Sequence, residues 1–542
     1  MNRRTFLYRS AAAAAGSLAV GSIRGVFAQS SKGSQPIVAT RAGKIRGVTV
    51  NAVKTFKGIP YGASTTGRAR FEPPVAPRPW TGVRDAIALG PKCPQEQDAL
   101  FRLLPELERP EPVGEDCLCL NVWTNAVGSD NKRPVMVWLH GGGYATGSGG
   151  FVLYDGAELA RKHDVVVVTV NHRLNVFGFL YLAEVGGANY SHATNAGMRD
   201  IVAALEWVRD NIAAFGGDPK NVTVFGQSGG AGKVSTLMAM PSARGLFHRA
   251  IAESGAALTG VSRADANRTT ETILARLGVK AAEINRLHEI PYAELLAAAA
   301  APGARAGEPP IRLAPVVDGS LLPRDPFTPD APPLSADVPL LIGSTATEVL
   351  FAQAPPSEPL DDAGLRARVK QTLRIDDSDA DRVIAVYRKG RPAASNGDLA
   401  ATIATDASAF ATGPNTEAER KAALGGAPVY RYYFSWYSPI RGGQLRSFHT
   451  LEIPFVFDHV DAVKEMTGTG PDRAPLAARM AGAWTAFART GNPNHAGLPE
   501  WRPFEAQKRT TMIFDKECRA VEDPYREERL AIAAITAANR RG

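Results

Sequence analysis

Short apolar runs alternate along the chain with longer segments in which apolar residues recur at helical spacing. Between residues 197 and 215, Ile201, Leu205, Val208 and Ile212 fall on one face of a helix. Four short runs predict strands: residues 134–140, 164–171, 221–227 and 337–343. Residues 164–171 are almost wholly apolar, as expected of a parallel strand covered by helices on both faces. This succession of strands and helices predicts an α/β fold built on a large, mostly parallel sheet.

The flanking segments extend this pattern. Residues 37–60 alternate apolar and polar positions around several glycines, which predicts antiparallel hairpins. Residues 262–307 and 356–426 show helical periodicity. We expect an aromatic strand over residues 429–437 and a helix over residues 479–490, where a Gly-Asn-Pro sequence follows.

The chain places a serine at a tight turn between a predicted strand and a predicted helix. Ser228 is flanked by Gly226 and Gly230, directly after the apolar run of residues 221–227. A serine in such a turn adopts a strained backbone and projects its hydroxyl above the sheet edge. The N-terminus of the following helix favours negative charge at the same point. Because Gly-x-Ser-x-Gly also occurs by chance, the motif predicts a nucleophile only if partner residues exist.

A run of three glycines follows another core strand. Gly141, Gly142 and Gly143 come directly after residues 134–140 and precede Tyr144. Glycines in this position free backbone N–H groups to point at one spot, as an oxyanion requires. The alternative is a glycine-rich turn without a ligand, but the position after a core strand favours the oxyanion interpretation.

A serine hydroxyl needs a general base, and that base needs an orienting carboxylate. In this type of fold the chain order is Ser, acid, His. Five histidines follow Ser228: His248, His288, His449, His459 and His495. His449 is the preferred base because it lies in a loop after a strong strand, with His459 as the weaker alternative. Glu348 lies just beyond the strand of residues 337–343 and is the preferred acid.

Several motifs occur in a fixed order along the chain. They are found at residues 58–61, 115–122, 211–219, 225–230, 245–250 and 449–457. Together they resemble the type-B carboxylesterase family, which includes the cholinesterases, over residues 37–529. The resemblance implies an α/β-hydrolase fold in which helical insertions form an active-site gorge.

The resemblance also implies roles for individual residues. Ser228 would be the nucleophile, His449 the base and Glu348 its carboxylate partner. The oxyanion would be held by the backbone N–H groups of Gly142, Gly143 and Gly229. An alanine is common in the family at the last of these positions, and glycine keeps the same N–H.

Other positions carry further implications of the resemblance. Tyr144 replaces a common phenylalanine and would place a hydroxyl near the substrate, while Phe351 would fall on the wall of the acyl site or gorge. Gln227 replaces a common glutamate, which removes a negative charge beside the site. Cys93 and Cys117 would form the first disulfide of the family, and we expect the other two cysteines to remain thiols.

These roles predict a serine hydrolase that cleaves small-molecule carboxylic esters through an acyl-enzyme, without cofactor or metal. The cysteines lack nearby histidines at zinc-ligand spacing. One alternative is a non-catalytic binding or adhesion protein, since the family includes members that lost the nucleophile. Another is an amidase or lipase that uses the same chemistry.

The N-terminal residues 1–28 predict a twin-arginine export signal. Arg3 and Arg4 precede a weakly hydrophobic, alanine-rich run, and Ala28 ends a cleavage-site pattern. The remaining residues, 29–542, are interpreted as one α/β-hydrolase domain in a periplasmic or secreted protein.

Cleavage lowers the formal charge from +8 to +4, because four arginines and no acidic residue are lost. This charge, without a dense basic block, argues against a nucleic-acid partner. No later run is long enough to span a membrane, and the oligomeric state stays open.

Overall fold

The computed structural model describes residues 35–539, apart from residues 129–131, 301–309 and 352–358. The predicted export signal, residues 1–28, lies outside the described residues. No described helix has the length and apolar character that crossing a bilayer requires.

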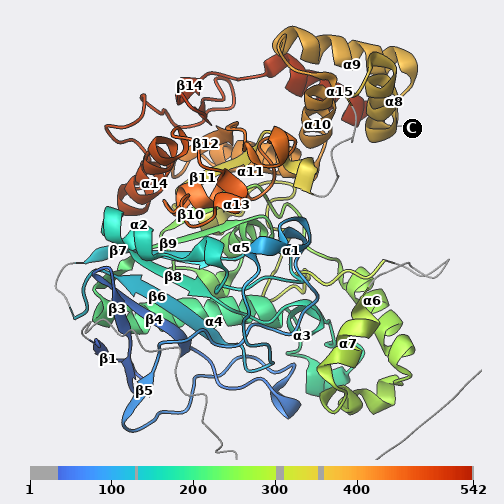
Figure 1. Ribbon diagram of the computed structural model, residues 1–542. Helices are drawn as coiled ribbons and strands as arrows, with labels where there is room; N and C mark the ends of the chain where they lie inside the picture. Colours follow the sequence, from blue (N-terminus) through green and yellow to red (C-terminus); the bar gives the residue numbers. More distant parts are fainter. Residues whose placement is uncertain (1–34, 129–131, 301–309, 352–358, 540–542) are drawn as a thin grey trace, which may run out of the picture. The chain divides into compact units, whose positions relative to one another are not determined.

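A central sheet of 11 strands organises the described chain (Figure 1). In spatial order the strands are β14 (Arg519–Val521), β13 (Thr511–Phe514), β12 (Val429–Phe434), β11 (Leu340–Thr345), β10 (Arg249–Glu253), β9 (Gly217–Gln227), β7 (Arg133–Leu139), β8 (Val166–Val170), β6 (Cys119–Thr124), β4 (Val53–Pro60) and β3 (Val48–Val50). The strands from β13 to β8 pair in parallel, and those outside them pair antiparallel. A small separate sheet contains β1 (Ile37–Ala39), β2 (Lys44–Arg46) and β5 (Val83–Asp85). The predicted mostly parallel sheet and N-terminal hairpins are therefore confirmed.

The central strands are apolar throughout because alternate side chains enter different cores. In β7, Val135, Val137 and Leu139 join one hydrophobic cluster. Met136 and Trp138, between them in sequence, join the other cluster. The sheet is thus buried on both faces.

Helices supply the other half of each core. On the face of Val137 lie α4 (Ala196–Asn211) and α5 (Gly229–Met238), and on the face of Trp138 lie α2 (Ala157–His163), α12 (Ile453–Val456) and α14 (Arg473–Thr490). The predicted helices over residues 197–215 and 479–490 correspond to α4 and α14. Shorter helices connect these layers: α1 (Ala99–Leu103), α3 (Asn175–Phe179) and α13 (Lys464–Thr467).

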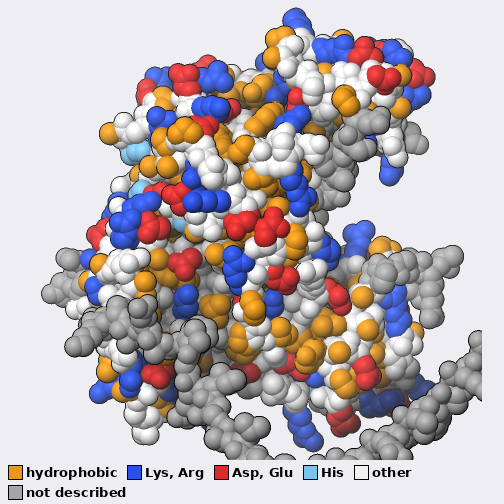
Figure 2. Space-filling view, viewed as in Figure 1, with side chains coloured by type: hydrophobic (Ala, Val, Ile, Leu, Met, Phe, Trp, Pro, Cys, Tyr) orange, Lys and Arg blue, Asp and Glu red, His pale blue; other side chains and the backbone are white. Residues whose placement is uncertain are grey.

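Two groups of helices come from the segments predicted to be helical insertions. The first contains α6 (Arg263–Leu277) and α7 (Tyr292–Ala299). The second contains α8 (Asp362–Leu373), α9 (Asp377–Gly390), α10 (Asn396–Asp406) and α11 (Ala409–Ala423). The C-terminal α15 (Arg526–Asn539) packs with α8, α9 and α10 around a small core of its own. Figure 2 shows the surface hollowed between these two groups, with acidic and basic side chains interspersed over the face in view.

Candidate active site

Ser228 lies at a sharp turn between β9 and α5. Its backbone has φ 58° and ψ −122°, a strained conformation for a residue with a side chain. A Cβ added to Gly230 would lie 1.9 Å from the carbonyl oxygen of Leu139, and one added to Gly226 would lie 2.5 Å from it. Both glycines are therefore required for the turn, as the sequence predicts.

Glu348 and His449, 101 residues apart in sequence, meet beyond the ends of their strands. An isolated bridge pairs Thr347 with Phe448, so the residue after each is brought to the same place. The His449 Nδ1 lies 2.5 Å from Glu348 Oε2, and both side chains are buried. The other carboxylate oxygen, Oε1, accepts a hydrogen bond of 2.7 Å from the Thr345 N–H. A proton on Nδ1 facing the carboxylate leaves Nε2 of the imidazole as a proton acceptor.

One cavity brings the predicted catalytic residues together. Ser228, Glu348 and His449 all line a cavity of about 590 Å³. The glycines Gly142 and Gly143 line it as well, and much of the remaining wall is apolar: Leu100, Phe151, Tyr154, Val349 and Phe410. The predicted nucleophile, its predicted base and the glycine loop thus share a single, largely apolar space, an arrangement that suits acyl transfer.

The amide groups of the glycine loop find no acceptor among the described residues. Gly142 has φ 79° and Gly143 has φ 62°, conformations that favour glycine. Within the part of the chain that the structure describes, the N–H groups of Gly142, Gly143 and Gly229 make no hydrogen bond to a protein acceptor. The loop is closed by its own turn, in which the Gly142 carbonyl accepts from Thr146 N at 3.0 Å. Three unused donors beside Ser228 fit the predicted oxyanion site.

Comparison with known proteins agrees with this geometry. A model of the carboxylesterase family matches residues 34–533. The chain belongs to the carboxylesterase family. It is 37% identical over 497 residues to para-nitrobenzyl esterase of Bacillus subtilis, covering 91% of this chain and 97% of that protein.

Solved structures show the same relationship. The carboxylesterase of Geobacillus stearothermophilus at pH 6.2 is 38% identical with a TM-score of 0.77, covering 91% of this chain and 99% of that one. An esterase of Clostridium hathewayi, described as able to hydrolyse aliphatic aromatic polyesters, is 34% identical with a TM-score of 0.80, covering 92% and 98%. This carboxylesterase therefore has the α/β-hydrolase fold.

Gln227 and Phe410 both contact the His449 imidazole in this carboxylesterase, and the sequence analysis did not predict either contact. The Gln227 Nε2 lies 3.3 Å from each ring nitrogen of His449. The ring of Phe410, at the start of α11, lies 4.5 Å from the imidazole, centre to centre. Both side chains restrict the imidazole to one position. The apolar spacing around Phe410 predicts a helix, but it does not indicate which other part of the chain that helix contacts.

Lys233 is a further residue that sequence reasoning did not identify. It lies on α5 with its side chain fully buried, and its Nζ donates to the carbonyl oxygens of His140, at 3.0 Å, and Gly143, at 2.8 Å. The described residues include no carboxylate in an ion pair with it. Burial lowers the pKa of Lys233 to about 7. By occupying the loop carbonyls, Lys233 holds the glycine loop so that its amides remain available to the cavity.

We expect burial of Lys233 to make stability depend on pH. Above a folded-state pKa of about 7 and below the ordinary value of 10.5, the unfolded chain binds the extra proton, so stability rises with pH. Relative to Lys233→Met, the free energy of unfolding of the wild type should increase by about 2 kcal/mol from pH 7 to pH 9. Urea unfolding followed by tryptophan fluorescence measures this difference. The exposed Lys389→Met is the control, and parallel wild-type and Lys233→Met curves would refute the expectation.

Tyr144 and Phe351 were predicted to lie near the substrate. Tyr144 is not among the residues that line the cavity. Its ring packs edge-on against Phe179 at 5.1 Å and lies beneath the Lys233 ammonium at 5.4 Å. Its hydroxyl lies against Gly232 on α5. The side chain of Phe351 lies outside the described residues, so its predicted position on the gorge wall stays a prediction.

Cys93 and Cys117 are both buried free thiols in the structure, so the predicted disulfide is not formed there. The two side chains are nevertheless neighbours, since a hydrogen bond with Cys93, together with burial, raises the pKa of the Cys117 thiol. Cys93 Sγ also accepts a hydrogen bond of 3.3 Å from the Leu174 N–H. Their pairing in an oxidising compartment stays a prediction. Among the described residues, no group of three or more His, Cys, Asp and Glu is placed to hold a metal.

Proposed function

We propose that this carboxylesterase hydrolyses small carboxylic esters through a Ser228–His449–Glu348 triad and an acyl-enzyme. The observation that carries the proposal is the 2.5 Å contact between Glu348 and His449 at the wall of the cavity that Ser228 also lines. The family relationship supports ester hydrolysis as the reaction. The apolar cavity wall favours esters whose acyl or alcohol groups are apolar.

In the first step His449 Nε2 takes the Ser228 proton as the hydroxyl oxygen attacks the ester carbonyl carbon. The carbonyl oxygen becomes an oxyanion, which the N–H groups of Gly142, Gly143 and Gly229 stabilise by about 3 kcal/mol per donor. The protonated imidazole is stabilised by the Glu348 carboxylate and then gives its proton to the departing alcohol. Water, deprotonated by the same imidazole, attacks the acyl-enzyme and releases the acid.

Covalent labelling tests the identity of the nucleophile. Diethyl p-nitrophenyl phosphate should add one diethylphosphoryl group per chain, at Ser228, and abolish ester hydrolysis in proportion to labelling. Mass spectrometry of the tryptic peptides locates the group. Ser408, which lines the same cavity, provides the control, because Ser408→Ala should still be labelled at Ser228. Full esterase activity in a fully labelled protein, or labelling at another residue, would contradict the proposal.

A further inference from the structure

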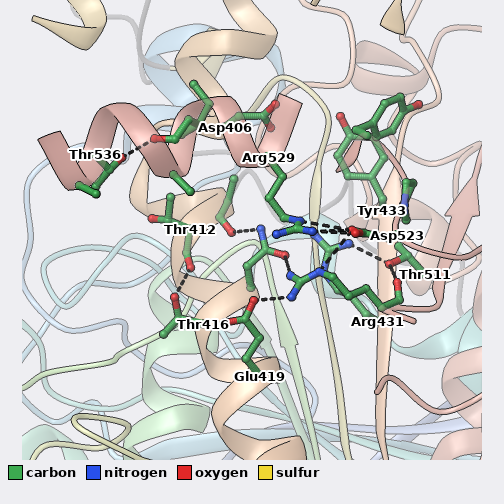
Figure 3. A pocket seen from close by; sticks show the side chains of 18 of the residues that line it. Asp406, Thr412, Thr416, Glu419, Arg431, Tyr433, Thr511, Asp523, Arg529 and Thr536 are labelled. Carbon is green, nitrogen blue, oxygen red and sulfur yellow. Dashed lines mark hydrogen bonds and ion pairs between the residues drawn. The ribbon is translucent and has the colours of Figure 1, made fainter. Parts of the chain in front are cut away.

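Two walls of the catalytic cavity are anchored in different ways. One wall includes Phe410 at the start of α11, and later turns of this helix line a second cavity of about 350 Å³ (Figure 3). Glu419 of α11 pairs there with Arg509, which also lies 3.4 Å from Asp523. Figure 3 shows Asp523 among guanidinium groups and Glu419 at the edge of the same cluster. Ion pairs therefore fix α11 on the side away from the catalytic cavity.

The wall formed by α1 is held without ion pairs. Leu100 of this helix lines the catalytic cavity. Arg102 is the only charged residue of α1, and it forms no ion pair within the described chain. Leu100 and Phe101 pack into the hydrophobic core. Asp98 caps the N-terminus of the helix, where its Oδ1 accepts a hydrogen bond of 2.9 Å from the Leu100 N–H.

The same carboxylate reaches the glycine loop. Asp98 is buried, and its second oxygen, Oδ2, accepts a hydrogen bond of 2.6 Å from the Thr146 hydroxyl. Thr146 closes the turn that begins at Gly142, since its N–H donates to the Gly142 carbonyl at 3.0 Å. A Cβ on Gly142 would collide with the Thr146 hydroxyl, so this hydroxyl lies directly against the loop backbone. One carboxylate therefore joins a wall of the cavity to the loop that carries the predicted oxyanion amides.

Gln95 holds the end of the same turn. Its Oε1 accepts a hydrogen bond of 2.6 Å from the Gly147 N–H, and its Nε2 donates to the Gly147 carbonyl at 2.8 Å. Gly147 has φ 114°, and a Cβ there would collide with the His140 ring, so this position has no room for a side chain. A carboxamide that pairs with both backbone groups of Gly147 fixes the turn from outside.

The glycine loop is thus held from two directions. From α5, Lys233 donates to the carbonyls of His140 and Gly143. From the segment before α1, Gln95 and Asp98 bind the far end of the turn. Glycines adopt several backbone conformations at little cost, so a loop that lost one of these attachments would reach other conformations. Because oxyanion donors act only when they are fixed in place, such a loop would stabilise the developing charge less.

We propose that Thr146 and Asp98 are positioning residues that hold the oxyanion amides by tying the glycine loop to α1. We call this pair the Thr146–Asp98 latch. The inference rests on the proposed function, since the latch affects catalysis only if the loop amides receive an oxyanion. Its loss should therefore lower kcat and the affinity for transition-state analogues, and it should leave the binding of substrate nearly unchanged.

Thr146→Val tests the latch with p-nitrophenyl butyrate as substrate, because valine removes the hydroxyl and keeps the shape of the side chain. We expect kcat to fall by about 10- to 100-fold with KM within about twofold, a smaller loss than that of an entire oxyanion donor. Thr146→Ser keeps the hydroxyl and should hold kcat within about threefold of the wild type. Thr40→Val is the matched control, because the Thr40 hydroxyl bonds to Gly43 in a glycine turn that does not line the cavity.

A double-mutant cycle tests the link between the two side chains. Asp98→Ala should lower kcat by a factor similar to that of Thr146→Val, and the double variant should lie within about twofold of the slower single variant. Asp361→Ala removes the carboxylate cap of α8, so it controls for the loss of a helix cap and should keep wild-type kcat. Losses of kcat that multiply in the double variant would overturn the link.

Inhibition separates positioning of the amides from general damage to the cavity. The carbonyl carbon of 1,1,1-trifluoro-2-octanone bonds to the serine oxygen and leaves an oxyanion facing the loop. Its affinity should fall in Thr146→Val by the factor lost from kcat/KM. The unfluorinated 2-octanone should bind equally to both proteins, which reports an intact cavity.

Two results would overturn the latch: wild-type kcat in Thr146→Val, or equal affinity of the fluorinated ketone for this variant and the wild type. Failure of diethyl p-nitrophenyl phosphate to label Ser228 would instead count against the proposed nucleophile. A selective loss of kcat in Thr146→Val would support the latch in either case, because it is measured against Thr40→Val and Thr146→Ser rather than against labelling.

Discussion

Replacing Ser228 with alanine is expected to lower kcat/KM for p-nitrophenyl butyrate by at least about 10⁴-fold. The substitution removes only the hydroxyl group. Alanine fits the strained turn no worse than serine because both carry a Cβ. The oxyanion amides and the apolar cavity remain, so residual hydrolysis above the buffer rate should reflect those groups alone. Initial rates at saturating and limiting ester separate the loss in kcat from any change in KM.

Ser235→Ala is the matched control for this variant. Ser235 lies on α5 seven residues after Ser228, is fully buried, and donates to Glu417 at 2.8 Å. Its replacement removes a hydroxyl group from the helix that follows the Ser228 turn, and it should leave kcat/KM within about threefold of the wild type. Retention of more than a tenth of wild-type turnover by Ser228→Ala would rule out this serine as the nucleophile.

Replacing Glu348 with glutamine is expected to lower kcat by about 10⁴-fold with little change in KM. The Thr345 N–H donates to Glu348 Oε1, so the amide oxygen of glutamine should keep that bond. The amide NH₂ then faces His449 Nδ1, which must accept rather than donate. The imidazole proton moves to Nε2, which can no longer take the proton of Ser228.

The control for this change is another buried carboxyl group. Burial raises the pKa of Glu417 to about 8, so it is mostly neutral at pH 7 and an amide mimics it closely. Glu417→Gln should therefore retain near wild-type kcat at pH 7. Labelling of Glu348→Gln by diethyl p-nitrophenyl phosphate should slow in parallel with kcat. Unchanged kcat in Glu348→Gln would assign the orienting role to a different group.

Predictions from the sequence were most successful where structure depends on neighbouring residues. The turn at Ser228 follows from Gly226 and Gly230, whose Cβ atoms would collide with the backbone at Leu139. Apolar runs became strands buried on both faces because their alternate side chains enter two cores. The predictions did not include β10, β13 or α15, which are short or amphipathic and gain their order from contacts with distant elements.

In the candidate active site too, local sequence patterns indicate the residues, whereas contacts between distant segments set their geometry. Choosing Glu348 and His449 used chain order and the position of each after a strand, but their 2.5 Å contact depends on the bridge between Thr347 and Phe448. Phe410 lies against His449 because α11 packs against β11 and β12.

By itself, the sequence determined the α/β class and the strained serine turn, and it indicated three candidate reactive side chains, because each leaves a pattern within a few residues. Only the tertiary structure decided that Lys233 holds the glycine loop and that Cys93 and Cys117 lie side by side. These facts concern which buried groups find partners. Partners come from elements far apart in the chain, and their packing is set by the shape and charge of the whole core rather than by any local pattern.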